Sequence, residues 1–333
     1  MPPIRVHPML RYVARRFSTG LVTLLGITIL TFIIIKLAPG DPAQARMVGL
    51  QGKRVSERVY QQLREYYGLD KPIHVQYFNW LGRLVKFDLG TSFYDGRPVA
   101  KKIGDAVWPT MSVAILSILL AFMISIPIGV YSAARQNGPF DRVASTTLYM
   151  VYSIPSYVVG MLLILYLGVK LDLFPFRGMH GDNYEQLSTL GKMIDLGRHY
   201  FMITVCETVG SLAYYSRFVR QNLLEVIRQD YIRTARAKGL GETQVIMKHA
   251  FVNSLIPFIT LLGLTFPALL SGSVILETMF NWPGLGRLFF ESVLQRDYPT
   301  LMALNFITAV MVLAGTLMAD LAYGLVDPRV SYD

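Results

Sequence analysis

Long apolar runs alternate with polar, charged segments along this chain, and the lengths of the runs are typical of membrane-spanning helices. A helix needs about 20 mostly apolar residues to cross the hydrocarbon core of a bilayer. Four runs meet this requirement, at roughly residues 18–38, 109–133, 144–171 and 301–326. Each of them predicts one transmembrane helix.

Two weaker runs extend this set. The run at about 251–276 contains Pro257 and Pro267, which membrane helices tolerate because neighbouring helices satisfy the freed backbone groups. The run at about 199–220 is interrupted by Glu207 and several hydroxyl groups. We count it as a span, because without it the basic segments on its two sides would lie on opposite sides of the membrane. The pattern predicts an all-α polytopic membrane protein with six transmembrane helices.

Composition and charge agree with this interpretation. The chain has 53% hydrophobic and 16% charged residues, a mean hydropathy of +0.40 and a net charge of +10. Basic residues near span ends favour the cytoplasmic side. With both termini in the cytoplasm, that side receives Arg5, Arg11, Arg15, Arg16, Arg135, Arg142 and the seven Lys/Arg of residues 217–248. Most of the charge therefore needs no nucleic-acid partner.

The first apolar run resembles a signal peptide in one respect, since Arg15-Arg16 precede it and Ala43-Gln44-Ala45 could form a cleavage site. The run is longer than the about 7–15 apolar residues of a signal peptide. We therefore expect an uncleaved first helix.

The sequence pattern predicts a small, mostly helical extracytoplasmic insert at residues 39–108. One helix is expected between Ser56, a good N-cap, and Gly68, a second one in VQYFNWLGRLV, and then a turn at Asp88-Leu89-Gly90. The expected organisation is residues 1–38 as N-terminus and first helix, 39–108 as insert, 109–326 as a five-helix core, and 327–333 as a cytoplasmic tail.

The stretch DYIRTARAKGLGETQ, residues 230–244, lies in the longest inner segment, 217–248. At 3.6 residues per turn, Tyr231, Thr234, Ala235 and Lys238 share one face, and Arg233, Arg236 and Leu240 share another. Small side chains allow close approach to a partner's backbone, and the cations can reach carboxylates or carbonyls. A helix lying on anionic lipid is the main alternative, and RNA binding is a third. Alanine and threonine bury little apolar area, which favours docking on a protein.

Other chemistry has little support in the sequence. One cysteine, Cys206, allows no disulfide framework, and the five histidines form no metal motif. The phosphate-binding motif G-x-x-x-x-G-K-[ST] is absent, since Met193 follows Gly191-Lys192 and Arg54 follows Gly52-Lys53. An intramembrane hydrolase is not supported, because no histidine lies mid-span beside a serine and G-x-S-x-G does not occur. We expect no catalytic residue and no enzyme activity in this chain alone.

Several segments occur in an order that resembles a known family. They are LAPGDP (37–42), YGLDKP (67–72), DLGTS (88–92), DYIRTARAKGL (230–240), ETMFNWPGLGR (277–287), RDYP (296–299) and DPRV (327–330). Together they resemble the dipeptide/oligopeptide branch of ABC transporter permeases. This chain has Arg233-Thr234-Ala235 where the permeases' general loop has Glu-Ala-Ala, as its branch does. It has no proline between residues 197 and 256, where the family usually has one near the start of the fourth helix, so the path of that helix stays open.

The resemblance implies a type I ABC importer permease of a prokaryotic inner membrane. Its partners would be a second homologous permease subunit, two ATP-binding subunits and an extracytoplasmic substrate-binding protein. ATP and Mg²⁺ would bind to the partner subunits, with no cofactor or metal in this chain. The residues implied in ATPase coupling are Asp230, Tyr231, Arg233, Thr234, Ala235, Arg236, Ala237, Lys238 and Gly239.

On the outer side, the resemblance implies a re-entrant loop at the mouth of the pathway. Its candidate contacts with substrate or binding protein are Glu277, Asn281, Trp282, Pro283 and Gly284. A simple loop turn with Trp282 as an interfacial anchor is the alternative.

Ionisable residues inside spans are functional candidates. Glu207 either faces a polar pathway, where it would meet a peptide's amino terminus, or extends to the outer interface. Asp320 is expected to pair with a basic group, and Lys36 to reach the outer interface.

Peptides are the expected cargo, with nickel, glutathione or sugars as alternatives within the family. A proton-coupled secondary transporter using Glu207 and Asp320 is the competing class. Such carriers are built from paired repeats, which this chain lacks, and need no cytoplasmic docking segment.

Overall fold

The computed structural model describes residues 6–37, 57–66, 68–255, 257 and 272–326. These residues are largely helical, with one isolated bridge between Thr91 and Pro98 and no strand among them. The helices are α1 (Val6–Leu37), α3 (Glu57–Tyr66), α4 (Ile73–Val85), α5 (Val99–Ala134), α6 (Pro139–Tyr152), α7 (Ser156–Leu163), η1 (Ile164–Lys170), η2 (Tyr184–Gln186), α8 (Thr189–Ile227), α9 (Asp230–Ala237), α10 (Glu242–Gln244), η3 (Val245–Phe251), α11 (Val252–Ser254), α14 (Val274–Met279), α15 (Leu285–Leu294) and α16 (Tyr298–Val326). The prediction of an all-α protein is confirmed.

Three helices of the described chain are long and apolar enough to cross a membrane. They are α1 over Ala14–Leu37, α5 over Val99–Ala134 and α16 over Tyr298–Met318. A fourth span exists if α6 and the helix formed by α7 and η1, which meet at 85°, count as one broken span. Six spans are not shown, and most of the run at 251–276 lies outside the described residues.

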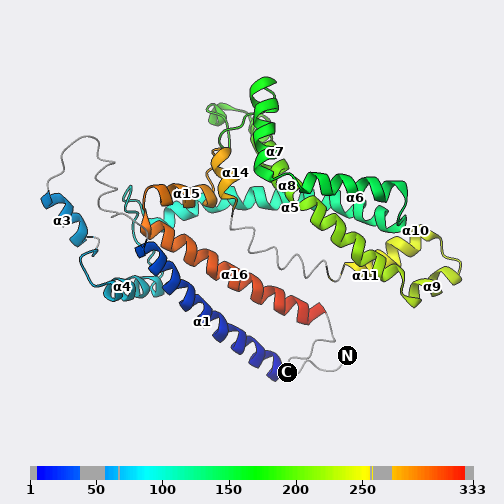
Figure 1. Ribbon diagram of the computed structural model, residues 1–333, viewed down its shortest axis with the longest axis horizontal. Helices are drawn as coiled ribbons and strands as arrows, with labels where there is room; N and C mark the ends of the chain where they lie inside the picture. The colour runs from blue at the N-terminus through cyan, green and yellow to red at the C-terminus, as the bar shows by residue number, and fades with distance from the viewer. Residues whose placement is uncertain (1–5, 38–56, 67, 256, 258–271, 327–333) are drawn as a thin grey trace.

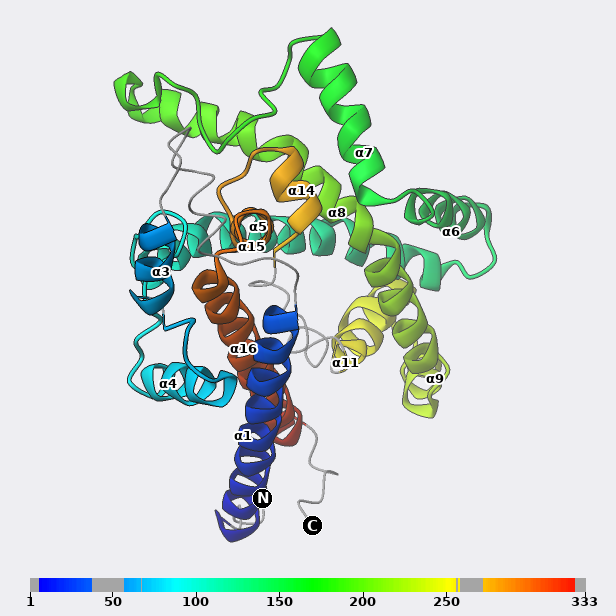
Figure 2. The same ribbon diagram turned by 60° about the vertical axis from the view of Figure 1, so that its left-hand side comes forward.

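The single run expected over residues 144–171 is divided into α6 and the helix formed by α7 and η1. The chain leaves α6 at Tyr152 and re-enters a helix at Ser156, with Pro155 as the preceding residue (Figure 2). Proline has no backbone N–H and disfavours the helical conformation at the residue before it. The break at residues 153–155 therefore follows from Pro155, and it turns α7 away from α6.

Two helix pairs organise the molecule. Helices α1 and α16 pack side by side in opposite directions, and α5 packs against α8 (Figure 1). The α5–α8 interface uses small and hydroxyl residues, as membrane helix interfaces do. A Cβ added at Gly129 would lie 2.8 Å from the Ser216 carbonyl oxygen, and the Thr208 hydroxyl donates to the Ser117 carbonyl at 3.3 Å.

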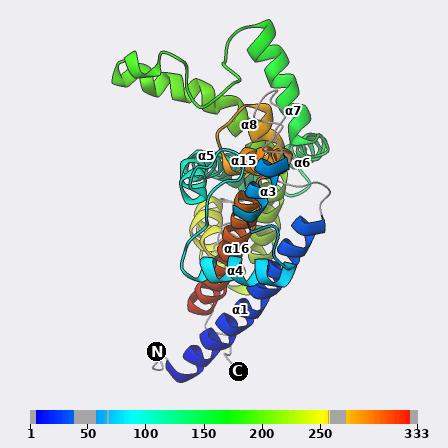
Figure 3. The ribbon, with the colours of Figure 1, turned by 90° about the vertical axis from the view of Figure 1, so that its left-hand side faces the viewer.

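Helix α8 runs for 39 residues without a break, so it extends beyond the expected span at 199–220 in both directions. The absence of proline between residues 197 and 256 is compatible with this continuous helix. In Figure 3, α7 and α8 project from the end of the molecule opposite the start of α1. The path of the fourth helix, which the sequence left open, is thereby defined.

The insert contains the expected helices as α3 and α4. The turn that follows is closed by a hydrogen bond from the Gly90 N–H to Asp88 Oδ1 at 2.9 Å. Ser56 lies outside the described residues. Residues 99–108, which the sequence placed in the insert, form the first turns of α5. Trp80 and Leu84 of α4 pack into a cluster with Phe32 of α1 and Tyr298 of α16, so the insert is fixed to the helix bundle.

Candidate functional site

Helix α9 is seated on the C-terminal ends of α5 and α8. Its residues Ile232 and Ala235 are buried, three positions apart, and project from the same side of the helix. They pack into a cluster with Ala133 of α5, Leu223 of α8 and Val245 of η3. A displacement of α9 must therefore move the helix ends beneath it.

The other side of α9 faces outward. Tyr231 has 46% of its surface exposed, although it is a large aromatic residue. The remaining outward positions of the predicted coupling set are Asp230, Arg233, Thr234, Arg236, Ala237, Lys238 and Gly239. The placement of Ala235 on the outward face with Tyr231 and Thr234 is wrong, because Ala235 completes the apolar stripe with Ile232.

The turn after α9 is held by an ion pair that sequence reasoning missed. Arg236 donates from Nε to Glu242 Oε2 at 3.0 Å and from Nη2 to Oε1 at 2.6 Å. This pair lowers the pKa of Glu242. Gly239, with φ of +78°, allows the chain to reverse between the two residues. Arg236 is thereby held by Glu242, whereas Arg233 and Lys238 are exposed, and Arg233 lies 3.5 Å from the exposed carboxylate of Asp230.

A second missed ion pair joins α6 to α8 close to α9. Arg220 donates to both carboxylate oxygens of Asp141, at 2.7 and 2.8 Å, and the Asn137 N–H donates to Asp141 Oδ2 at 2.9 Å. The hydrogen bond from Arg220 is the largest reason that the pKa of Asp141 is lowered. Asp141 is buried. The α5–α6 connection is therefore fixed to the helix that leads into α9.

The predicted outer loop, residues 277–287, is built around Glu277. The Thr110 hydroxyl of α5 donates to Glu277 Oε1 at 2.8 Å, and the Arg287 N–H donates to Oε2 at 3.0 Å. Thr110 also accepts the Leu285 N–H at 2.8 Å. Glu277 is almost fully buried. Its role in this structure is to hold the loop against the start of α5.

Trp282 is also internal. Only 1% of its surface is exposed, its Nε1–H donates to the Pro109 carbonyl at 3.0 Å, and its ring packs edge-on against Tyr200. The alternative of an interfacial anchor at Trp282 is therefore wrong. Gly284 is buried too, whereas Asn281 and Pro283 are exposed. Of the residues expected at the mouth, these last two are the accessible ones.

Glu207 lies half-buried in α8 on the side of α5. The Ser117 hydroxyl of α5 hydrogen-bonds to its carboxylate, and Glu277 is close enough to repel it electrostatically. The structure thus brings two predicted site residues, Glu207 and Glu277, into one region between α5, α8 and α14. Lys36 donates to Gln76 Oε1 at 2.5 Å, and the side chain of Asp320 lies outside the described part.

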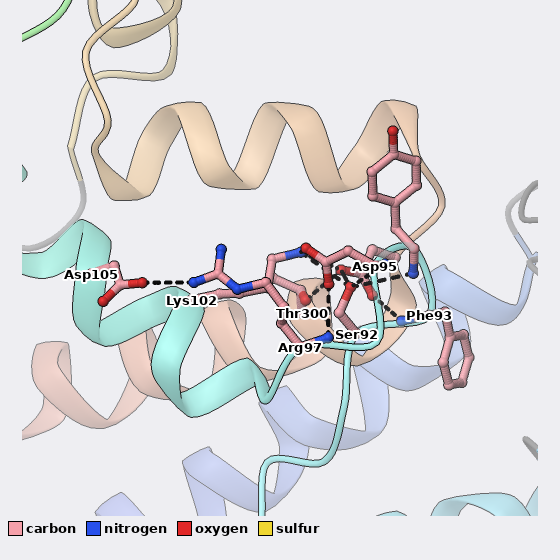
Figure 4. A network of polar contacts seen from close by, with 9 residues as sticks. Ser92, Phe93, Asp95, Arg97, Lys102, Asp105 and Thr300 are labelled. Atoms are coloured by element: carbon pink, nitrogen blue, oxygen red, sulfur yellow. Dashed lines mark hydrogen bonds and ion pairs between the residues drawn. The ribbon is translucent and has the colours of Figure 1, made fainter. Parts of the chain in front are cut away.

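A buried polar network joins the end of the insert to the start of α16. Asp297 accepts hydrogen bonds from the Ser92 hydroxyl at 2.7 Å, the Phe93 N–H at 2.8 Å and the Thr300 hydroxyl at 2.6 Å. Lys102 lies 3.2 Å from Asp297 and 3.1 Å from Asp95. Figure 4 shows the labelled members of this network. The DLGTS and RDYP segments noted in the sequence therefore meet here.

Beside this network, on the predicted outer side, lies a cavity of about 330 Å³, called the outer cavity. It is lined by the charged residues Asp95, Arg97, Lys102, Asp105, Arg287 and Glu291, and by Pro283 and Gly284. The described residues contain no group of three or more His, Cys, Asp or Glu side chains that could hold a metal ion. The arrangement provides charged and hydrogen-bonding surfaces.

Comparisons with known proteins agree with this architecture. Residues 125–332 match the family described as binding-protein-dependent transport system inner membrane component, and residues 9–114 match the N-terminal membrane component of these systems. The chain is 42% identical over 325 residues to the oligopeptide transport system permease protein AppB of Bacillus subtilis (strain 168), covering 97% of this chain and 100% of that protein. It is 35% identical over 324 residues to the glutathione transport system permease protein GsiC of Salmonella choleraesuis (strain SC-B67), with the same shares covered.

A solved structure supports the fold. The inward-facing MetNI methionine ABC transporter matches with a TM-score of 0.55 and 19% identity, over 69% of this chain and 98% of that chain. This likeness supports the helical architecture and nothing about cargo. The chain belongs to the binding-protein-dependent transport system inner membrane component family and is a membrane-spanning permease subunit of an ABC importer, not its ATPase.

Proposed function

We propose that this permease imports peptides and that α9 is the element through which separate ATP-binding subunits drive it. The coupling role is supported by the two different faces of α9, one buried and one exposed. Ile232 and Ala235 anchor it in the chain's own core, while Tyr231, Arg233 and Lys238 point outward. Aromatic and arginine side chains of this kind supply much of the binding energy at protein interfaces.

The proposed complex contains a second homologous permease subunit, two ATP-binding subunits that carry ATP and Mg²⁺, and an extracytoplasmic substrate-binding protein. Both termini and α9 lie in the cytoplasm, and the exposed Asn281 and Pro283 face the binding protein. This placement follows the distribution of basic residues along the chain.

The proposed mechanism is a two-state switch. Closure of the ATP-binding subunits displaces α9, and because α9 is packed on the inner ends of α5 and α8, those helices move with it. The Asp141–Arg220 pair carries the displacement to α6. ATP thereby favours one orientation of the helices over the other.

The peptide cargo is supported by two observations. Similar permeases are named for oligopeptides and for glutathione. In addition, the carboxylate of Glu207 lies between α5 and α8, and within the described part of the chain its neighbours are the Ser117 hydroxyl and the carboxylate of Glu277. A buried carboxylate of this kind favours a cationic group, which the amino terminus of a peptide supplies.

The docking of α9 is tested with Tyr231→Ala and Arg233→Glu in the full complex. We expect the ATP-binding subunits to dissociate more readily during purification, with substrate-stimulated ATPase activity reduced at least tenfold. Arg142→Glu, an exposed arginine on α6 rather than on α9, is the matched control. Ala235→Glu is unsuitable, because it places a charge in the chain's own core. Full retention and full stimulation in Tyr231→Ala and Arg233→Glu would exclude the docking assignment.

The cargo is tested with proteoliposomes that contain the complete importer and its binding protein. We expect ATP-dependent uptake of labelled di- and oligopeptides but not of nickel or sugars, and uptake that persists when a protonophore removes the proton gradient. Uptake of a non-peptide alone would exclude the peptide cargo. Loss of uptake with a protonophore, ATP still present, would favour a proton-coupled carrier.

A further inference from the structure

Helix α4 has two exposed flanks of opposite character. Its inner side is occupied by Trp80 and Leu84. On one flank, Phe78 and Val85, seven residues apart and thus on the same side, are 65% and 75% exposed. On the opposite flank, Asn79 and Arg83 are exposed. The apolar surface of α4 is therefore wider than the side that packs against protein.

The contacts of α4 with α1 define its height along a membrane-spanning helix. The Tyr77 hydroxyl lies 3.0 Å from Thr28 Oγ1, and Lys36 Nζ hydrogen-bonds to Gln76. With a rise of about 1.5 Å per residue, Thr28 lies about 13 Å below the end of α1 at Leu37. The apolar stretch of α1 begins at Ala14 and has 24 residues. If Leu37 marks the outer surface of a hydrocarbon core about 30 Å thick, the Tyr77 hydroxyl therefore lies among the acyl chains of the outer leaflet.

The apolar flank is continuous with a surface that already faces lipid. On α1, Leu30 and Ile34 are exposed at the same height as α4, and they lie on a helix apolar enough to span the membrane. Directly after α4, Phe87 is 92% exposed. Exposure of so many large apolar side chains to water would cost about 25 cal/mol per Å², and large apolar patches mark interaction surfaces.

The polar flank has the charge expected at the level of lipid headgroups. Asn79 and Arg83 line a cavity of about 240 Å³ together with Lys36, Lys71 and Glu65. Three cations and one carboxylate give this cavity a net positive charge, which complements lipid phosphates. Lys and Arg side chains commonly reach the headgroup region from apolar surroundings.

We propose that α4 is an interfacial helix embedded in the outer leaflet, with lipid acyl chains against Phe78, Val85 and Phe87. The insert is then anchored in the bilayer rather than suspended outside it. Because the DLGTS turn follows α4 directly, this anchor holds Ser92 and the outer cavity at a constant height above the membrane.

The test places a fluorophore at single cysteines in the full complex reconstituted in phosphatidylcholine/phosphatidylglycerol nanodiscs. The native Cys206, a buried thiol, is first replaced by alanine. Phe78→Cys and Val85→Cys report on the apolar flank, and Asn79→Cys on the polar flank is the matched control. We expect spin-labelled lipids to quench positions 78 and 85 at least threefold more than position 79, and aqueous iodide to do the reverse.

Two results would overturn the proposal. Iodide quenching of positions 78 and 85 equal to that of position 79 would place α4 in water. Protection of positions 78 and 85 from both quenchers would mean that protein, either another segment of this chain or a partner subunit, covers the flank.

Discussion

The hydroxyl of Ser92 lies 2.7 Å from Asp297 Oδ2, although 205 residues separate the two along the chain. Asp297 is fully buried and also faces Lys102 and Thr300. A buried carboxylate is tolerated only when charge and hydrogen bonds compensate its lost hydration. The end of the insert and the start of α16 therefore form one structural unit.

Asp297→Asn removes the charge that faces the buried Lys102. We expect a loss of about 1.5–3 kcal/mol in the free energy of unfolding, since the hydrogen bonds to a charged carboxylate are weakened, while Lys102 keeps Asp95 as an anionic partner at 3.1 Å. Asp105→Asn is the matched control, because the Arg97–Asp105 pair is half-exposed and exposed pairs contribute about 0–1 kcal/mol. Thermal unfolding of the detergent-purified protein measures both. Equal melting temperatures would contradict the structural role of Asp297.

Gly284→Ala tests the packing of the outer loop. The added Cβ would lie 2.4 Å from Glu277 Oε2 and 2.5 Å from the Thr110 hydroxyl, so the loop must shift away from α5. We expect a loss of about 1–3 kcal/mol, as for other overpacked sites, and weaker coupling to the binding protein. Gly197→Ala in α8, where a Cβ meets nothing within 4 Å, should be neutral or stabilising. Unfolding and binding-protein-stimulated ATPase activity provide the two measurements.

Gly239 and Gly241 form a matched pair after α9. A Cβ at either position meets nothing within 4 Å, but Gly239 has φ of +78° and Gly241 has φ of −65°. Gly239→Ala should therefore cost about 1–2 kcal/mol from the left-handed backbone, and Gly241→Ala about zero. We expect faster amide hydrogen exchange in α9 for Gly239→Ala only. The same exchange rates in both variants would show that the backbone conformation at residue 239 is not constrained.

The Asp141–Arg220 pair predicts an acid-sensitive link between α6 and α8. Because Arg220 lowers the pKa of Asp141 in the folded state, the pair stabilises the fold above the ordinary pKa of 3.8, and this contribution is lost as the pH falls through the lowered folded value. Asp141→Asn should remove this contribution at neutral pH, at a cost of about 1.5–3 kcal/mol for a charged hydrogen bond. In this variant, the free energy of unfolding should also fall less steeply as the pH is lowered. If Asp141→Asn loses stability in acid as steeply as the unchanged protein, other groups cause that loss.

The Asp141→Arg, Arg220→Asp double exchange separates the charge pair from its site. If the pair itself links α6 to α8, the double variant should recover part of the stability and of the coupled ATPase activity that each single variant loses. Losses that simply add would show that the two residues act independently.

The sequence alone was sufficient for the elements whose causes are local. The apolar runs of α1, α5 and α16 are long enough to identify them as spans. The turn at Asp88 and Gly90 follows from local hydrogen bonding. The order of the short motifs was also sufficient to indicate the permease family, which the comparisons confirmed.

Only the tertiary structure showed which side chains are buried and which distant residues pair, because both depend on where the core lies. Helical periodicity showed which residues of 230–240 share a face but not which face turns inward, and burial of Ile232 placed Ala235 inside with it. Trp282 was equally compatible with a membrane interface or a protein interior until Pro109 provided a buried acceptor. Asp141 and Asp297 could not be recognised as sites, because their partners are distant in sequence and a buried charge is defined by what surrounds it.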